Sequence, residues 1–310
     1  MIHKSGFLCQ PCVKVALAMF EPRIALGTVQ FGQNYGVANE LGQVGIQECG
    51  RILDEAFSQG VDTIDTAIGY GDSEVILGSL GLENWKIISK LPQLPESVFS
   101  NTFGWVLDQV TASLNRLRVG SLHGLLLHYQ DQLLSPVGKD IYQSLLRLKE
   151  EGYVKKIGVS IYSPTELDSI FEEMHFDIVQ APFSILDRRL VNSGWLKRLR
   201  DANVEVHIRS IFLQGLLLMS NARRPQKFDR WQSIWSEWNR WLEENRLTPL
   251  EACLGYVLSI DDVDRVVIGV DSHAQLCEIF SSMNQRNLSL PKWPENMDME
   301  LLHPAHWVSL

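Results

Sequence analysis

The chain has 310 residues, of which 45% are hydrophobic and 21% are charged, and its formal net charge is −9. This composition is typical of a globular protein with a sizeable core, and the acidic balance argues against a nucleic-acid-binding surface driven by basic charge. No apolar run reaches the length needed to span a membrane. Five cysteines without framework spacing, and no signal-peptide pattern, predict a cytoplasmic protein.

Cys9 and Cys12 form a Cys-x-x-Cys pair ahead of the first convincing strand, which begins at Arg23. Such a pair is compatible with a redox couple or with half of a metal site, but no second pair follows to complete the ligands. We therefore interpret residues 1–22 as an N-terminal extension that is poorly ordered, and we predict no metal site.

Strands and helices alternate along the rest of the chain, with boundaries set by helical spacing, glycine stops and proline starts. The predicted strands are 23–28, 62–67, 86–90, 124–128, 156–160, 178–181, 205–210 and 266–270. The predicted helices are 46–59, 73–80, 102–117, 138–151, 164–174, 189–202, 249–259 and 272–283, with a Trp-rich helix at 229–245.

Eight strand–helix pairs predict a closed parallel (β/α)8 barrel, the TIM-barrel class of α/β fold, as a single domain over residues 23–286. A doubly wound open sheet is the alternative, but no Gly-x-Gly-x-x-Gly follows the first strand. The pattern does not place the polar C-terminal tail, residues 287–310.

Four tryptophans lie within the predicted helix at 229–245, at close to helical spacing. We interpret them as the packing face of an inserted helix, with a substrate lid or a dimer surface as the alternatives. They are Trp231, Trp235, Trp238 and Trp241.

Polar side chains stand at the carboxyl ends of three neighbouring predicted strands. Asp65, Lys90 and His128 end the second, third and fourth strands, and Tyr70 follows Asp65 by five residues in the next turn. Each alone has a structural interpretation, such as a cap, a packing residue or a solvated strand end. However, a charged group at the end of an apolar strand is costly unless it is paired. In a parallel barrel these ends meet on the catalytic face, so the set predicts a shared function.

The residue types suggest one reaction. Lys90 beside the Tyr70 hydroxyl would lower the pKa of the phenol from its usual value of about 10. Asp65 would keep Lys90 charged, and His128 would donate or orient a hydrogen bond at the substrate oxygen. Such a tyrosine is suited to protonate a carbonyl oxygen as a cofactor delivers hydride to the carbon.

These residues resemble the aldo-keto reductase family. The run from Asp65 to Glu74 is similar to the family signature Asp-Thr-Ala-x-x-Tyr-Gly-x-Ser-Glu, and the resemblance extends over roughly residues 23–283. It implies NAD(P)H-dependent reduction of an aldehyde or ketone to an alcohol. The catalytic residues implied by the resemblance are Asp65, Tyr70, Lys90 and His128.

The resemblance also implies a cofactor cleft. Its expected residues are Gly27, Thr28, Asp65, Ser160, Gln180, Arg209, Ser210, Leu213, Gln214, Gly215, Gly269, Val270, Ser272 and Gln275. Ile161, Arg209 and Asp271 depart from the family pattern, which usually has an asparagine, often a stacked tyrosine, and a Lys or Arg for the 2′-phosphate. NADP(H) is favoured over NAD(H) by the family preference and the helix N-terminus at Ser272. Asp271, however, suits a ribose hydroxyl.

The substrate is specified less closely. Phe31, Tyr35 and Tyr129 are expected to line its pocket and to suit a polar, hydroxylated carbonyl compound such as a sugar. We expect no nucleic-acid or membrane partner, and a monomer or weak homo-oligomer. Two alternatives are a non-catalytic NADP(H)-binding regulatory protein on the same fold, and a lyase or isomerase with Lys90 as a Schiff-base amine.

Overall fold

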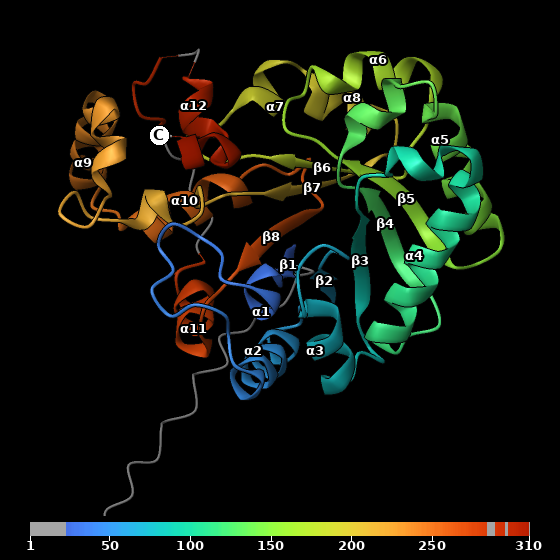
Figure 1. The fold of residues 1–310 in the computed structure, drawn as a ribbon. Helices are drawn as coiled ribbons and strands as arrows, with labels where there is room; N and C mark the ends of the chain where they lie inside the picture. Colours follow the sequence, from blue (N-terminus) through green and yellow to red (C-terminus); the bar gives the residue numbers. More distant parts are fainter. Residues whose placement is uncertain (1–22, 284–288, 295–296, 310) are drawn as a thin grey trace, which may run out of the picture.

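The computed structural model describes residues 23–283, 289–294 and 297–309. Eight parallel strands close into a barrel in chain order, with β1 pairing to β8 as well as to β2, and helices surround it (Figure 1). The predicted (β/α)8 barrel is therefore confirmed. The predicted N-terminal extension, with Cys9 and Cys12, lies outside the described residues.

The strands are β1 (Ile24–Gly27), β2 (Thr63–Asp65), β3 (Lys86–Leu91), β4 (Leu122–Leu127), β5 (Val154–Ser160), β6 (Ile178–Pro182), β7 (Glu205–Arg209) and β8 (Arg265–Gly269). The first α-helices are α1 (Val29–Gly32), α2 (Ile46–Ser58), α3 (Ser73–Leu80), α4 (Thr102–Leu117), α5 (Gly138–Glu150) and α6 (Glu166–Glu173). The later ones are α7 (Arg189–Asn192), α8 (Trp195–Asp201), α9 (Gln232–Asn245), α10 (Pro249–Leu258), α11 (His273–Ser281) and α12 (Met299–Leu302). Short 3-10 helices lie at Glu96–Asn101, Gln130–Leu134, Leu216–Leu218, Gln226–Trp231 and Pro304–Ser309.

The helix predicted over 189–202 is divided in the structure. α7 ends at Asn192 and α8 begins at Trp195, and Gly194 between them has a φ of 78°. A right-handed helix does not continue through this left-handed conformation, which glycine adopts at little cost. The sequence pattern showed the apolar face of both pieces but not the break.

The barrel interior is filled by side chains. Ile88 on β3, Leu126 on β4 and Ile178 on β6 form a buried cluster. Gly158 on β5 makes room for them, because a Cβ there would lie 2.5 Å from Leu126 Cδ2 and 2.3 Å from the carbonyl oxygen of Ile178. A packed interior leaves the loops at the carboxyl ends of the strands as the place for a ligand.

The Trp-rich helix α9 lies outside the ring of barrel helices, next to α12 (Figure 1). Trp235 and Trp238 on α9 are fully buried. The indole of Trp238 donates to the carbonyl of Leu217 at 3.1 Å, and that of Trp231 donates to Asp298 in the C-terminal segment at 3.0 Å. These contacts confirm that the tryptophans are packing residues, and they place the described part of the tail, which the sequence pattern could not.

In the described part of the chain, no helix combines the length and the apolar character that crossing a bilayer requires.

Glu74, the last residue of the signature run, is buried beside α4. Its carboxylate accepts hydrogen bonds from the hydroxyls of Ser89 at 2.8 Å and Ser113 at 2.7 Å. Arg116 also donates two hydrogen bonds to Glu74 Oε2, from Nε at 2.9 Å and from Nη2 at 2.7 Å. A buried carboxylate requires such partners. Glu74 therefore joins α3, β3 and α4, and its role is structural.

We expect Arg116→Met to lower the free energy of unfolding by about 3 kcal/mol, because the Glu74 carboxylate would stay buried with only two hydroxyl donors. Urea denaturation measures this loss. Lys139→Met is the matched control, since Lys139 is 82% exposed and its removal should cost less than about 0.5 kcal/mol. Equal stability of the two variants would contradict the assigned role of the network.

Candidate active site

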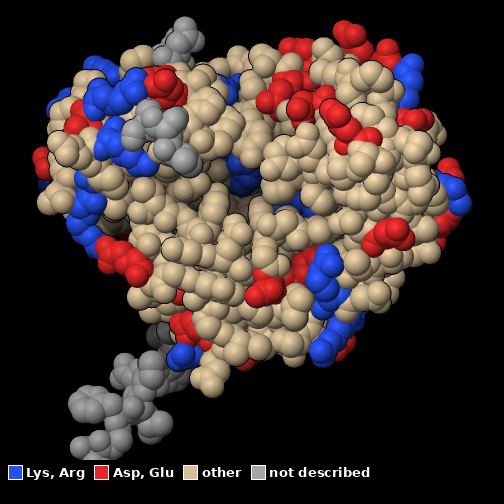
Figure 2. All heavy atoms as spheres, viewed as in Figure 1, with Lys and Arg blue, Asp and Glu red and all other residues tan. Residues whose placement is uncertain are grey.

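A cavity of about 1150 Å³ opens at the carboxyl ends of the strands. Its wall includes residues of the strands and the loops after β1 and β7, and it reaches α11. Figure 2 shows a hollow near the middle of this face, with Lys or Arg atoms visible inside it. This is the end of the barrel at which the sequence placed the polar strand ends.

Lys90 on β3 and Asp65 at the end of β2 form a buried ion pair. Lys90 Nζ lies 2.6 Å from Asp65 Oδ1, and their side chains are 1% and 5% exposed. Lys90 also donates to the carbonyl of Thr66 at 3.0 Å, and Gln180 on β6 donates to Asp65 Oδ2 at 2.6 Å. Burial lowers the pKa of Lys90, and the adjacent Asp65 carboxylate limits that lowering. Both charges are thus fixed by partners on other strands or turns.

The rings of Tyr70 and His128 complete the cluster. Lys90 Nζ lies 5.0 Å from the centroid of the Tyr70 ring. His128 follows β4, and its ring meets that of Tyr70 edge-on with centroids 5.8 Å apart. The structure thus brings together all four predicted catalytic residues.

The acidity of Tyr70 differs from the expectation. Burial raises the pKa of the phenol, Asp65 acts in the same direction, and Arg209 opposes them. The ammonium of Lys90 directs its hydrogen bonds to Asp65 and Thr66, and the loss of hydration outweighs its attraction for a phenolate. Tyr70 is therefore protonated at neutral pH.

A close backbone contact holds Tyr70 in place. A Cβ on Gly32 would lie 1.7 Å from the carbonyl oxygen of Tyr70, and one on Gly71 would lie 2.3 Å from the carbonyl oxygen of Gly32. Gly71 also has a φ of 52°, in the left-handed region. The Ser73 hydroxyl donates to the carbonyl of Thr28 at 2.9 Å. The turns after β1 and β2 are thus locked together.

Most of the predicted cofactor residues line the cavity. They are Gly27, Thr28, Asp65, Ser160, Gln180, Arg209, Ser210, Gln214, Gly215, Gly269, Val270 and Gln275. The structure places Leu213 and Ser272 differently. Leu213 is 1% exposed and packs in the core, and the Ser272 hydroxyl caps α11 by accepting from the backbone N–H of Gln275 at 3.2 Å.

The predicted substrate-pocket residues also separate into two groups. Tyr35 and Tyr129 line the cavity and are 38% and 44% exposed. Phe31 instead has no exposed surface and packs in the hydrophobic core. The physical reason is that Phe31 belongs to the short helix α1, whose buried side places the ring in the hydrophobic core.

The cavity wall carries two buried polar atoms without a hydrogen-bond partner, Gln30 Oε1 and Asp271 Oδ1. An unsatisfied buried acceptor is costly, so both oxygens suit donors on a ligand. Gly269 allows a close approach here, because a Cβ would lie 2.6 Å from Gln30 Oε1. These features fit a long, polar ligand such as a nicotinamide dinucleotide.

Sequence reasoning missed several wall residues. Gln30 and Tyr162 line the cavity, and the only feature of the sequence that could have indicated this is their position two residues after the end of a predicted strand. A clasp between the loops after β1 and β7 was also missed. There, Gln214 Nε2 donates to the Tyr35 hydroxyl at 3.0 Å, and Arg223 pairs with Glu40. No local pattern reveals a contact between segments so far apart in the chain.

The family model described as "Aldo/keto reductase family" matches residues 23–295. The chain belongs to the aldo-keto reductase family. This membership agrees with the closed barrel and with the position of the four polar residues at its catalytic end.

Curated relatives share part of the chain. It is 29% identical over 225 residues to the NADH-specific methylglyoxal reductase of Escherichia coli K12, covering 63% of this chain and 65% of the relative. It is 26% identical over 190 residues to the D-arabinose 1-dehydrogenase of Saccharomyces cerevisiae, covering 56% and 57%. The matches thus span less than two thirds of the length of these relatives.

A solved structure supports the fold. The holo form of an aldo-keto reductase from Bacillus halodurans has a TM-score of 0.67 and 20% identity, and covers 86% of this chain and 88% of that one.

His128 is expected to be neutral at neutral pH. Burial, helped by Lys90 and Arg209, lowers the pKa of its imidazole to about 4. In the unfolded chain the imidazole binds a proton below about pH 6.5, whereas in the folded protein it stays neutral until about pH 4. Protonation of His128 therefore favours the unfolded state, and the free energy of unfolding decreases as the pH falls from about 6.5 toward 4. NMR titration of the imidazole, assigned with His128→Gln, should give a midpoint well below 6.5. A midpoint at or above that value would refute this assignment.

Proposed function

We propose that this protein is a nicotinamide-dependent reductase of aldehydes or ketones, with Tyr70 as the proton donor. The observation that carries the proposal is the cluster at three neighbouring strand ends. There, the buried Lys90–Asp65 pair lies against the Tyr70 ring, and His128 meets the edge of that ring. A regulatory binding protein would have no need of this costly arrangement beside an open cavity.

When bound, a reduced nicotinamide supplies the hydride. Tyr70 keeps its proton at neutral pH, because burial raises the pKa of the phenol, and it can give that proton to a carbonyl oxygen. The Lys90 ammonium, 5.0 Å from the ring centroid, stabilises the phenolate that remains. Neutral His128 can donate an N–H to the same substrate oxygen, and Gln180 holds Asp65 so that the ion pair keeps its geometry.

The position of Lys90 disfavours the Schiff-base alternative. Its side chain is 1% exposed, and its amine is engaged with Asp65 and Thr66. A Schiff-base lysine must present a neutral amine to the substrate. Lys90 instead lies behind the cavity wall as a paired cation, which supports a role next to Tyr70.

We propose a small, polar carbonyl compound as the substrate. The cavity wall includes, besides Tyr70, the polar side chains of Gln33, Tyr35, Tyr129 and Arg209. Within the described chain, Arg209 has no carboxylate within ion-pair distance, so its guanidinium suits a carboxylate or phosphate on the substrate. Two relatives are named for their action on methylglyoxal, a 2-oxoaldehyde, and on D-arabinose, an aldose, so both compounds should be tested as substrates.

We further propose NAD(H) as the cofactor, which reverses the preference for NADP(H) drawn from the family resemblance. Asp271 presents an unpartnered carboxylate oxygen to the cavity, suited to a ribose hydroxyl and repulsive to a 2′-phosphate. Ser272, which was expected to help bind that phosphate, is occupied as the cap of α11. Glu278 on the same helix adds a second acidic group to the wall. The Escherichia coli relative is itself named as NADH-specific.

Tyr70→Phe should lower kcat for the best substrate of a carbonyl panel by at least about 100-fold, because the proton donor is lost. The dissociation constant for NADH, measured by fluorescence titration, should stay within about twofold. Tyr142→Phe is the matched control, since that phenol bonds to the carbonyl of His175 on the outer surface. Wild-type kcat in Tyr70→Phe would disprove the mechanism.

The wild-type protein should bind NADH more tightly than NADPH in the same titration. Asp271→Ser should improve NADPH binding by about tenfold, or about 1.4 kcal/mol, because the repulsion of the 2′-phosphate is removed. Asp261→Ser, at an exposed aspartate before β8, should change neither affinity. Tighter binding of NADPH by the wild-type protein would show that the cofactor proposal is wrong.

A further inference from the structure

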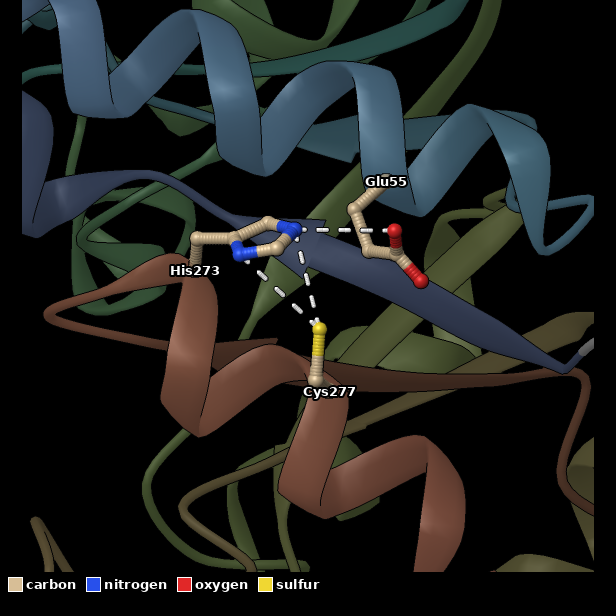
Figure 3. A group of neighbouring side chains, drawn as sticks. All are labelled: Glu55, His273 and Cys277. Atoms are coloured by element: carbon tan, nitrogen blue, oxygen red, sulfur yellow. Dashed lines mark hydrogen bonds and ion pairs between the residues drawn. The ribbon is translucent and has the colours of Figure 1, made fainter. Parts of the chain in front are cut away.

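Three potential metal ligands, none of which lines the cavity, meet between α2 and α11 (Figure 3). His273 and Cys277 are four residues apart on α11 and therefore share a face, and Glu55 reaches them from α2. His273 Nε2 lies 3.5 Å from Glu55 Oε2 and 3.6 Å from Cys277 Sγ. One nitrogen, one sulfur and one oxygen atom all lie within 4.8 Å of one another.

We propose that Glu55, His273 and Cys277 bind a zinc ion, with water as the fourth ligand. Tetrahedral zinc, with about 2.3 Å to sulfur and about 2.0–2.2 Å to nitrogen and oxygen, requires ligand atoms about 3.3–3.6 Å apart. Two of the three pairs already have this separation. The His273–Glu55 distance of 3.5 Å is long for a hydrogen bond, which usually measures about 2.7–3.2 Å. The spacing fits ligands of a shared ion better than a direct bond.

Neighbouring groups orient these ligands. Gln59 donates to Glu55 Oε1 at 2.9 Å, which leaves Oε2 for His273 and the ion. The backbone N–H of His273 donates to Glu48 Oε1 at 2.7 Å, which ties the start of α11 to α2. Such supporting hydrogen bonds fix ligand geometry in metal sites and raise affinity.

The ligand types select the ion. A thiolate, an imidazole and a carboxylate suit zinc, whereas magnesium and calcium favour oxygen ligands alone. The side chains of His273 and Glu55 are 37% and 24% exposed, so an ion and a water molecule can reach them. Binding displaces the thiol proton of Cys277, since the thiolate is the ligand.

The site lies where the barrel closes. α2 follows β1 and α11 follows β8, and these two strands pair with each other. An ion here would connect the first and last strand–helix units. Gln275 and Ile279, also on α11, line the cavity. Zinc would therefore stabilise a helix of the cavity wall without contacting any residue of the proposed reaction, so the two proposals are tested independently.

Metal binding is measured on the full chain after dialysis against EDTA under reducing conditions, with Co²⁺ as the spectroscopic probe. One equivalent of Co²⁺ should give a thiolate-to-cobalt charge-transfer band, which added Zn²⁺ should remove by displacement. Cys277→Ser and His273→Asn should each abolish the band. Glu55→Gln should weaken Zn²⁺ binding, measured by competition with a chromophoric chelator, by at least about tenfold.

Two variants are matched controls. The Cys9→Ser/Cys12→Ser double variant removes the other closely spaced thiols, and Asp54→Asn removes the exposed carboxylate next to Glu55; both should keep the band. Circular dichroism of the metal-free variants verifies folding, and His273→Asn, which retains the thiol, decides the outcome if Cys277→Ser unfolds. Absence of the band in the wild-type protein would overturn the site, as would a band that depends on Cys9 and Cys12 instead of His273.

Discussion

The buried ion pair of Lys90 and Asp65 is the constraint on which the catalytic end of the barrel depends. The side chains of Lys90 and Asp65 are 1% and 5% exposed, and charges so deeply buried are tolerated only if the ammonium and the carboxylate have hydrogen-bond partners. Gln180 donates a hydrogen bond to one oxygen of the Asp65 carboxylate, and the Lys90 ammonium donates to the carbonyl of Thr66. These partners come from β2, β3, β6 and the turn after β2, so the pair fixes the relative positions of strand ends that are distant in sequence.

The same burial sets the acidity of Tyr70. A phenol held against a shielded ion pair loses hydration, and the negative Asp65 further disfavours its ionised form. The phenol is therefore a proton donor at rest, and its position depends on the backbone as much as on the charges. Gly32 and Gly71 let the turns after β1 and β2 approach closely enough to hold it there.

Local patterns predicted the barrel, the three polar residues at strand ends and Tyr70 in the turn after Asp65, because helical spacing and strand-end position depend on neighbouring residues alone. The orientation of side chains in short segments was less predictable. Phe31 in α1 is buried in the core instead of lining the cavity, and Ser272 caps α11 instead of facing a ligand, although its position before a helix was compatible with either role. The pair formed by His273 and Cys277 has a visible four-residue spacing, but Glu55 approaches it only because the barrel closes. Contacts created by closure have no local signal.

Two departures from the family pattern, Ile161 and Arg209, are in direct contact. The Arg209 guanidinium donates to the carbonyl of Ile161 at 3.0 Å and lies 4.7 Å from the centroid of the Tyr162 ring. The Ile161 side chain is fully buried, so that residue offers Arg209 only its backbone. Held in this way, Arg209 is a cation that partly offsets the rise in the pKa of Tyr70 and adds to the lowering of the pKa of His128. Arg209 therefore shifts the pKa of the Tyr70 phenol in the direction expected of Lys90 from the sequence, although burial outweighs it.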